Sequence, residues 1–550
     1  MLNRQTLLQA AIIVLLINLG SVLYQSFFGS PESLLEIDSM PSQVVTSSVV
    51  QDTRSDRFVL VTTEKMKVLL DTNGGRVARV SFNDYTSGDG DYLFFDDNNA
   101  QFLDAQVGYT GDKNLNFKAG RSSYTAPKGG SVSVRMTATN SKGVQYSKTF
   151  VFDSDSYAVK VSSSVLNRSD ETVAVRPYYA FTGDKVTSLE DSKVPTPQTL
   201  NFDPDAESLL AAVRGYNGVS YPTSKKAYVR QSFKDMAKGV TPTTMKGGWV
   251  AFQKHHFISA WVMDDAKQFK YSDFWLDGET EQGSGLYEQK FVTQAVGAKE
   301  VLTQGSVVSS QSQFYVGPQI KENLIALAPT LKLTLDYGFF WMIANFLGVL
   351  LKVVHSVIPS WGWCLVMLVL LARALLYPMT QNQAAQAKAM KKIQPEKAQI
   401  DKRFEGRGAF DLEKHEALTA LYKKHNLKIG IFSALAPFIQ LPLFIAFYGM
   451  ISVSVEFRQS AFLWISDLSL PDPFYILPAS AVLVMFWQSE DSEVGPEFKM
   501  VMRFLPIVFA LFVVRLPASL QLYAGLNTVL HVLQTKMLKQ GAGGLLAHKK

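Results

Sequence analysis

The amino-acid sequence predicts a multi-domain membrane protein in which a large all-β domain is joined to an α-helical membrane core, with six transmembrane helices in total. Three observations predict this class. An apolar segment near the amino terminus is long enough to cross a bilayer, a long stretch of short alternating runs follows it, and apolar runs return only in the carboxyl-terminal part. The mean hydropathy of +0.05 therefore averages two different kinds of sequence.

The first apolar segment, Leu7 to Phe28, has about 22 residues, enough to cross a hydrocarbon core of about 30 Å. Arg4 precedes the segment and acidic residues follow it, which places the amino terminus inside. No small-residue cleavage site ends the segment, so residues 1–30 are predicted to be a retained transmembrane anchor. Residues 31–56 are rich in Ser, Val, Gln and Asp and are predicted to be a linker.

Residues 57–318 are predicted to form an all-β domain on the outer side of the membrane. Short runs alternate apolar and polar residues, as in Arg57 to Val61 and Ser131 to Arg135, and glycine-containing turns separate them. This pattern is typical of two packed sheets. The adjacent His255 and His256 would point to opposite faces of a strand, so we expect one packed histidine, one solvated histidine and no catalytic pair.

Five further spans are predicted in residues 359–540, which would form the helical core. They run from Trp361 to Thr380, Ile431 to Val453, Phe474 to Trp487, Met500 to Arg515 and Pro517 to Lys536. The preceding residues 319–358 are predicted to hold amphipathic helices that lie in the outer interface. An even number of spans places both termini inside, and the basic loop 381–428 and the tail 541–550 agree with that orientation.

The inner loop 381–428 is predicted to form a helical hairpin. Its helices would run from Ala384 to Phe404, with a kink at Pro395, and from Leu412 to His425. The residues expected to pack between them are Met390, Ile393, Ile400 and Phe404 on one helix and Leu418, Leu421 and Tyr422 on the other. The basic surface would favour anionic lipid, ribosomal RNA or an acidic nascent chain, and a merely solvated face is the alternative.

Arg373 is the most informative residue because it lies about thirteen residues into a predicted span of about twenty. Insertion scales put the cost of such an arginine at about 2.5 to 3.5 kcal/mol, so its side chain should face a polar cavity or reach the inner interface. Polar residues of the last span recur at helical spacing: Gln521, Asn527, Thr528, His531, Gln534 and Thr535. With Gln440 they either line a hydrated groove or hydrogen-bond neighbouring helices.

Cys364 is the single cysteine and lies in an apolar run, so the sequence holds neither a disulfide framework nor a thiolate cluster for a metal. The acidic residues of the β domain lie in turn-like sequence, with no base at a useful spacing. We therefore expect no catalytic residues, no metal and no cofactor.

Several long strings lie in a fixed order along the chain. They are Val316 to Pro318, Leu333 to Gly338, Ala372-Arg373 with Tyr377-Pro378, Gln440 to Phe444, Trp464 to Leu468 and Asp472 to Pro478. Together they resemble the YidC insertase family of Gram-negative bacteria. The resemblance covers the whole chain, but Asn426 to Gly430, Arg515 and the short tail depart from the family pattern, which leaves ribosome docking open.

The resemblance implies a membrane-protein insertase and folding chaperone of the bacterial inner membrane, and not an enzyme. It implies a periplasmic supersandwich domain like that of sugar mutarotases. Arg373 would face a hydrophilic intramembrane groove that receives nascent membrane proteins and releases them into lipid, with Gln440, Asn527 and Thr528 beside it. The implied partners are nascent membrane proteins, Sec translocon subunits, the ribosome or signal recognition pathway, and membrane lipids, with the Sec translocon optional.

Two other functions stay open from the residues alone. A small-solute transporter would also place a charged residue inside a helix bundle, although the sequence has no evident internal repeat. A membrane-anchored carbohydrate-active protein would use the β domain, although that domain has no recognisable catalytic pairing.

Overall fold

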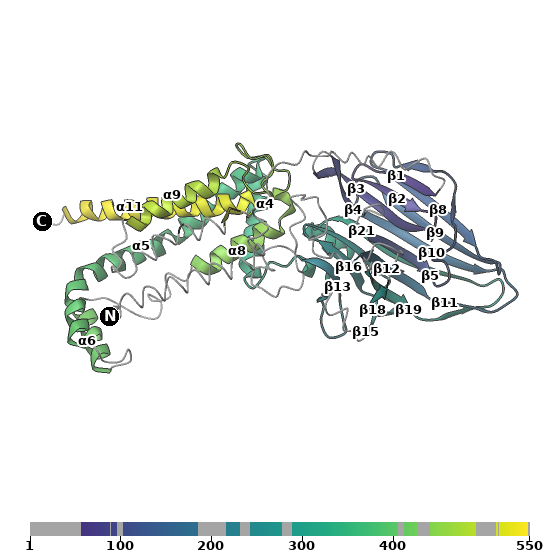
Figure 1. Cartoon of the computed structure of the whole chain (residues 1–550), viewed down its shortest axis with the longest axis horizontal. Coiled ribbons are helices and arrows are strands. Elements are labelled where there is room, and N and C mark those ends of the chain that lie inside the picture. The colour runs from purple at the N-terminus through teal and green to yellow at the C-terminus, as the bar shows by residue number, and fades with distance from the viewer. Residues whose placement is uncertain are drawn as a thin grey trace, which may run out of the picture. The chain divides into compact units, whose positions relative to one another are not determined.

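The computed structural model describes residues 57–87, 90–95, 103–184, 216–231, 243–277, 289–404, 412–425, 440–490, 506, 513, 514 and 516–547. The expected anchor 1–30, the linker 31–56 and nearly all of the span Met500 to Arg515 lie outside these residues. The described residues form two compact units, one that ends at Asp336 and one that begins at Tyr337. Figure 1 shows the first unit as mainly strands and the second as helices.

The first unit is built on two large sheets (Figure 1). The ten-stranded sheet has the order β15 (Thr243–Lys246), β18 (Gln268–Asp277), β19 (Gln289–Gly297), β12 (Pro177–Asp184), β5 (Leu103–Tyr109), β3 (Arg76–Ser87), β2 (Met66–Asp71), β1 (Phe58–Thr62) and β7 (Ser123–Thr125), with β4 (Gly90–Phe95) paired to β3. Adjacent strands are antiparallel except β1 and β7, which are parallel.

The nine-stranded sheet has the order β14 (Val229–Gln231), β13 (Asn217–Tyr221), β16 (Trp249–Lys254), β17 (Phe257–Met263), β21 (Val307–Pro318), β10 (Ala158–Asn167), β9 (Val144–Asp153), β8 (Ser131–Thr139) and β6 (Lys118–Ala119). A third, two-stranded sheet pairs β11 (Val173–Val175) with β20 (Glu300–Leu302).

The inner faces of the two large sheets pack against each other. Tyr179 of β12 hydrogen-bonds Ser310 of β21, and both side chains are buried. Strand β9 alternates buried and partly buried residues along its whole length, as a strand with one core face should. The predicted all-β domain of two packed sheets is therefore confirmed, while the supersandwich class stays a prediction.

His255 and His256 form the turn between β16 and β17, so the expectation that they belong to one strand is wrong. The turn requires a left-handed backbone, and His255 adopts φ 54°. His256 is 6% exposed and His255 is exposed, which confirms one packed and one solvated histidine.

The end of the first unit is tied to the nine-stranded sheet. After β21 come α3 (Lys321–Leu327) and the 3₁₀ helix η4 (Leu331–Thr334). The indole of Trp249 donates a hydrogen bond to the Thr330 hydroxyl over 2.9 Å, and Arg230 pairs with Asp336 over 2.6 Å. Residues 319–336 therefore belong with the sheets, and the chain enters the helical unit at Tyr337.

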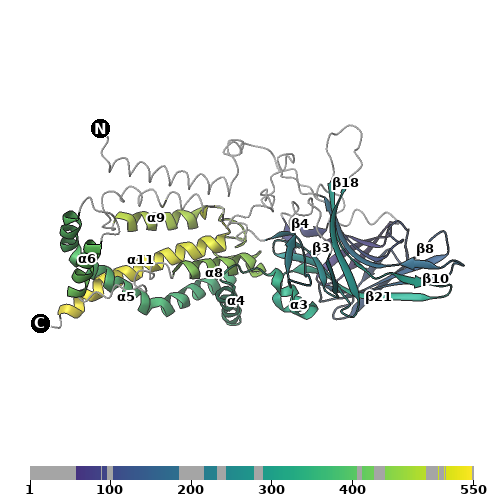
Figure 2. The same ribbon diagram turned by 90° about the horizontal axis from the view of Figure 1, so that it is seen from below.

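The second unit contains α4 (Trp341–His355), α5 (Trp361–Arg403), α6 (Leu412–Lys424), α8 (Gln440–Val453), the 3₁₀ helix η6 (Val455–Phe457), α9 (Ile476–Glu490) and α11 (Ala518–Ala547). Helix α11 packs against α5, α8 and α9, as Figure 2 shows. Helix α4 packs against α5 and α8 with one buried face, on which Ala344, Leu347 and Leu351 lie. Its opposite face exposes Met342 and Phe346.

Helix α5 is continuous for 43 residues, where the sequence predicts a span and then a separate hairpin helix. Both Pro378 and Pro395 lie inside the helix. The run of Ala, Gln and Lys after Pro378 consists of strong helix formers, which explains why one missing backbone donor does not end the helix. The first helix of the hairpin is therefore a continuation of the first core helix.

The hairpin of α5 and α6 has the expected apolar contact. Of the residues expected there, Ile393, Phe404 and Leu421 are buried, and the Met390 side chain lies outside the described part. The other three are only partly buried: Ile400, Leu418 and Tyr422. Lys424 and His425 both contact Glu396, at 2.9 and 3.0 Å. The Lys424 hydrogen bond lowers the pKa of Glu396, and His425 adds to that shift.

Within the described residues, α5 is the one helix long and apolar enough to cross a membrane, over Trp361–Pro378. Shorter apolar helices cover Trp341–His355, Pro442–Val453 and Ile476–Trp487. Helix α11 continues to Ala547, so most of the expected tail 541–550 is helical.

Candidate functional site at Arg373

Arg373 lies on α5, inside the apolar segment Trp361–Pro378, and is 6% exposed. Leucines dominate the sequence around it, and exposed Leu371 and Leu375 flank it on the same helix. The arginine side chain therefore turns away from the exposed apolar surface and into the bundle.

Among the described residues, the hydrogen-bond partners of the Arg373 guanidinium all lie on α11. Its Nε donates to the Asn527 side-chain carbonyl over 2.9 Å, and Nη2 donates to the Asn527 backbone carbonyl over 2.8 Å. Its Nη1 donates to the Gln534 carbonyl over a longer 3.4 Å. Asn527 and Gln534 are seven residues apart, about two helical turns, so they share one face of α11.

The hydrogen-bond partners of Arg373 are all neutral groups. Within the described part of the chain no carboxylate pairs with this guanidinium, and the titratable groups that interact with it electrostatically are the phenol of Tyr523 and the imidazole of His531. A buried charge without a counter-charge is costly, and it is the expected feature of a site that receives an anionic group.

The other predicted groove residues, Thr528 and Gln440, make no described contact with Arg373. The Thr528 hydroxyl donates to the Ala524 carbonyl of its own helix over 2.8 Å, and no hydrogen bond joins it to Arg373 among the described residues. The backbone of Gln440 begins α8, but its side chain lies outside the described part. The cluster therefore consists of Arg373, Asn527 and Gln534.

Gln521 belongs to a separate structural cluster, although it shares the polar stripe in the sequence. Its amide nitrogen donates to the carbonyls of Val513, Val514 and Leu516, and its carbonyl accepts from the backbone of Asp472. Gln521 is fully buried and satisfies the backbone groups of the turn before α11.

The Asp472 carboxylate fixes the loop between α8 and α9. It accepts hydrogen bonds from the Trp464 indole and from the backbone nitrogens of Phe474 and Leu477, at 2.7 to 3.0 Å. The strings Trp464 to Leu468 and Asp472 to Pro478 thus meet in one loop that caps α9. Carbonyls of Leu468 and Leu470 accept from the first nitrogens of α11.

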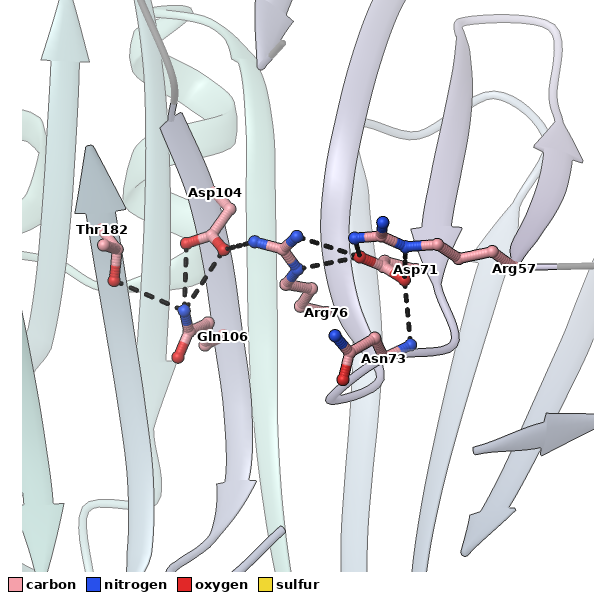
Figure 3. A network of polar contacts seen from close by, with 7 residues as sticks. All are labelled: Arg57, Asp71, Asn73, Arg76, Asp104, Gln106 and Thr182. Carbon is pink, nitrogen blue, oxygen red and sulfur yellow. Dashed lines mark hydrogen bonds and ion pairs between the residues drawn. The ribbon is translucent and has the colours of Figure 1, made fainter. Parts of the chain in front are cut away.

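The first unit contains a polar network with residues from β2, β3, β5 and β12 of the ten-stranded sheet, from the turn after β2 and from the residue before β1 (Figure 3). Arg76 lies between the carboxylates of Asp71 and Asp104, and pairs with both. Arg57 adds a second pair to Asp71 over 2.8 Å. Gln106 links Asp104 to Thr182 through hydrogen bonds of 3.2 and 3.4 Å, as Figure 3 shows.

The two carboxylates of this network have opposite pKa shifts. Burial raises the pKa of Asp71, but hydrogen bonds from Arg57, the Asn73 backbone and Arg76 outweigh it and leave that pKa lowered. Burial raises the pKa of Asp104, and Arg76 only partly opposes this. Both carboxylate side chains are 0% exposed, so the network stabilises the sheet and does not present a reactive group.

Lys148 and Asp112 form a second buried ion pair that sequence reasoning missed. Their side chains are both 1% exposed and their charged atoms are 3.0 Å apart. Lys148 also donates to the Gly74 carbonyl, and Asp112 accepts from the Tyr178 hydroxyl and the Tyr109 backbone. The signal was present, because Lys148 shares the alternation of the buried residues Tyr146 and Phe150.

Comparison with known proteins matches two family models, one after the other along the chain. Residues 59–350 match the family model described as the YidC periplasmic domain, and residues 353–543 match the one described as 60Kd inner membrane protein. The membrane protein insertase YidC of Aeromonas hydrophila is 31% identical over 500 residues, which cover 88% of this chain and 86% of that protein. The chain belongs to the YidC family.

Other members of the YidC family agree. The membrane protein insertase YidC of Shewanella halifaxensis is 29% identical over 505 residues, 88% of this chain and 86% of its own length. A crystal structure of an active YidC insertase with its first transmembrane domain covers 88% of this chain and 93% of its own, at 14% identity and a TM-score of 0.35. The family assignment rests on the sequence matches alone.

Proposed function

We propose that this chain is a membrane-protein insertase and folding chaperone, and that the cluster of Arg373, Asn527 and Gln534 is where it meets an inserting protein. One observation carries the site: a buried arginine lies in the one described helix that is long and apolar enough to cross a membrane, and it has only neutral hydrogen-bond partners among the described residues. Relatives over most of the chain are named membrane protein insertases, which supports the activity.

The proposed mechanism needs neither a nucleotide nor a covalent step. The polar face of α11 and Arg373 would line a hydrophilic groove within the membrane, with Gln440 and Thr528 beside it. An acidic outward-going segment of the client would pair with the guanidinium and so lose less free energy on leaving water. The client's apolar segment would enter lipid beside the groove, driven by about 25 cal/mol per Å² of apolar surface buried.

The proposed placement is multi-pass in the bacterial inner membrane, with six spans, both termini in the cytoplasm and the sheet unit in the periplasm. Exposed apolar side chains on α4, α5 and α9 support contact with lipid: Met342, Phe346, Leu371, Leu375, Leu483 and Trp487. The match of residues 59–350 to a periplasmic domain supports the orientation. Helix α4 would lie in the outer interface.

Several partners belong to the same proposal. Nascent membrane proteins would be the clients, with or without Sec translocon subunits. The hairpin of α5 and α6 exposes Lys402, Arg403, Lys423 and Lys424, which would favour the ribosome, a component of the signal recognition pathway or anionic lipid. The YidC family assignment supports this function over a solute transporter or a carbohydrate-active protein.

The test uses the purified full chain in proteoliposomes. A two-span client with an acidic outer loop should become protected from protease well above the level in empty liposomes. Arg373→Ala should lower protection of this client by about tenfold, and should lower protection of a matched client with a glutamine loop much less. Equal protection with and without the protein would contradict the insertase, and equal losses for both clients would contradict the arginine site.

A further inference from the structure

Arg373 binds its two α11 partners with unequal strength. Asn527 takes Nε and Nη2 through its side-chain carbonyl and its backbone carbonyl, at 2.9 and 2.8 Å. Gln534 takes Nη1 at 3.4 Å, near the upper limit for a hydrogen bond. One edge of the guanidinium is therefore firmly held, and the opposite nitrogen is loosely held.

The mobility of the two acceptors differs for a structural reason. The Asn527 backbone carbonyl is part of α11 and cannot leave without distorting the helix. The Gln534 carbonyl sits at the end of a side chain with rotatable bonds and can swing away without any backbone change. Release of Gln534 thus breaks one long, neutral hydrogen bond and leaves the orientation of Arg373 unchanged.

A guanidinium has five N–H donors, and the contacts with Asn527 and Gln534 use three of them. Nη1 and Nη2 are the pair of nitrogens that can bind both oxygens of a carboxylate, and Gln534 occupies a donor of Nη1. A carboxylate forms shorter and stronger hydrogen bonds with this cation than an amide carbonyl does, so it would displace Gln534.

We propose that Gln534 is a specificity-determining residue of the insertase: its amide carbonyl occupies the position on Arg373 that the carboxylate of a client Asp or Glu takes. The inference rests on the proposed function of the Arg373 site. Asn527 is then the positioning residue, because it fixes the edge of the guanidinium that the client does not use. Displacement of a weak neutral partner favours acidic segments over neutral ones.

The opposing explanation is that Gln534 only joins α11 to α5. If Gln534 only packs the two helices together, its substitution should change the insertion of every client equally. If its carbonyl competes with the client for the guanidinium, its substitution should change the preference for acidic clients. The decisive quantity is therefore the ratio of insertion rates for two matched clients, one with an acidic outer loop and one with glutamines in its place.

The experiment compares two variants at the site with a control, each as full chain in proteoliposomes. Gln534→Glu keeps nearly the same shape and supplies a permanent carboxylate for Arg373. Gln534→Met keeps the length and removes the carbonyl. Gln399→Glu is the charge control, because Gln399 is exposed and lies 26 residues from Arg373 along α5, about 39 Å of helix. Thermal unfolding in detergent establishes that each variant is folded.

Gln534→Glu should lower the ratio of acidic-client to neutral-client insertion rates by about tenfold or more. The coupling energies of close charge pairs correspond to a change of at least that size. Gln534→Met should raise the ratio, since nothing competes for Nη1, and Gln399→Glu should leave it unchanged. Equal effects of Gln534→Glu and Gln534→Met, or equal losses for both clients, would overturn the inference. If only Arg373→Ala changes the ratio, the proposed function stands and the role of Gln534 does not.

Discussion

Lys148 occupies a position that the alternation of β9 assigns to the core, and a buried ammonium there needs a partner. Asp112 supplies it from the loop after β5, with Tyr178 as a further donor to the carboxylate. Burial lowers the pKa of Lys148, and Asp112 opposes the shift. A lysine at a core position of a strand thus predicts a buried ion pair, although only the fold identifies its partner.

Lys148→Met should destabilise the sheet unit by about 3 to 5 kcal/mol, because it leaves the Asp112 carboxylate buried without its counter-charge. The measurement is denaturant unfolding of the full chain in detergent, followed by tryptophan fluorescence. Lys128→Met is the matched control, since Lys128 is 91% exposed and should cost less than about 0.5 kcal/mol. Equal stability of the two variants would show that the buried pair contributes nothing.

Asp71 should make the sheet unit sensitive to acid. Its folded pKa lies below the ordinary 3.8, so its contribution to stability is present above pH 3.8 and is lost as the pH falls through the folded pKa. Asp71→Asn should be less stable than the native chain at neutral pH, and the difference in unfolding free energy should shrink below pH 3.8. A difference that stays constant with pH would rule out this role of the carboxylate.

At the scale of elements, the alternating runs predict the strands because each strand has one core face and one polar face. The boundaries of α5 could not be predicted, because a proline signals a helix end locally while the strong helix formers after Pro378 and packing against α4, α6 and α11 favour continuation. The polar stripe of α11 was visible as a pattern. Only the structure separates Gln521, which satisfies a turn, from Asn527 and Gln534, which hold Arg373.

Gln521→Leu should lower the thermal stability of the helical unit and insertion of all clients together. It removes the side-chain donor of the Val514 and Leu516 carbonyls, at about 1 to 3 kcal/mol for each buried group left unpaired, while the Val513 carbonyl keeps the backbone N–H of Leu516. Thermal unfolding in detergent and the two-client assay measure this. Ser480→Ala is the comparison, because Ser480 is exposed and, among the described residues, its hydroxyl donates to the Leu477 carbonyl of its own helix. A selective loss of acidic clients would place Gln521 in the client site instead.

At the scale of the whole molecule, the chain combines a sheet unit stabilised by buried ion pairs with a helical unit that exposes apolar side chains. The sequence predicts this division, since hydropathy and charge differ between the two parts. The proposed site joins Arg373 and Asn527, which lie 154 residues apart in the chain, and that contact follows from helix packing rather than from any local pattern.

The proposed orientation predicts which surfaces a membrane-impermeant maleimide reaches in intact spheroplasts. In a Cys364→Ser background, cysteine at the exposed Ser131 of β8 should be labelled from outside. Cysteine at the exposed Ala420 of α6 should be labelled only after the membrane is permeabilised. Labelling of Ala420→Cys in intact spheroplasts would reverse the orientation of the hairpin.

The central claim is that the charge of Arg373 selects the client, and reversal of that charge tests it most directly. The full chain with Arg373→Glu, shown to be folded by thermal unfolding, is compared with the native chain on clients whose outer loops differ only in acidic or basic residues. The native chain should insert the acidic client faster, and Arg373→Glu should insert the basic client faster. An equal loss for both clients, with the native preference retained, would contradict a direct pairing between Arg373 and the client.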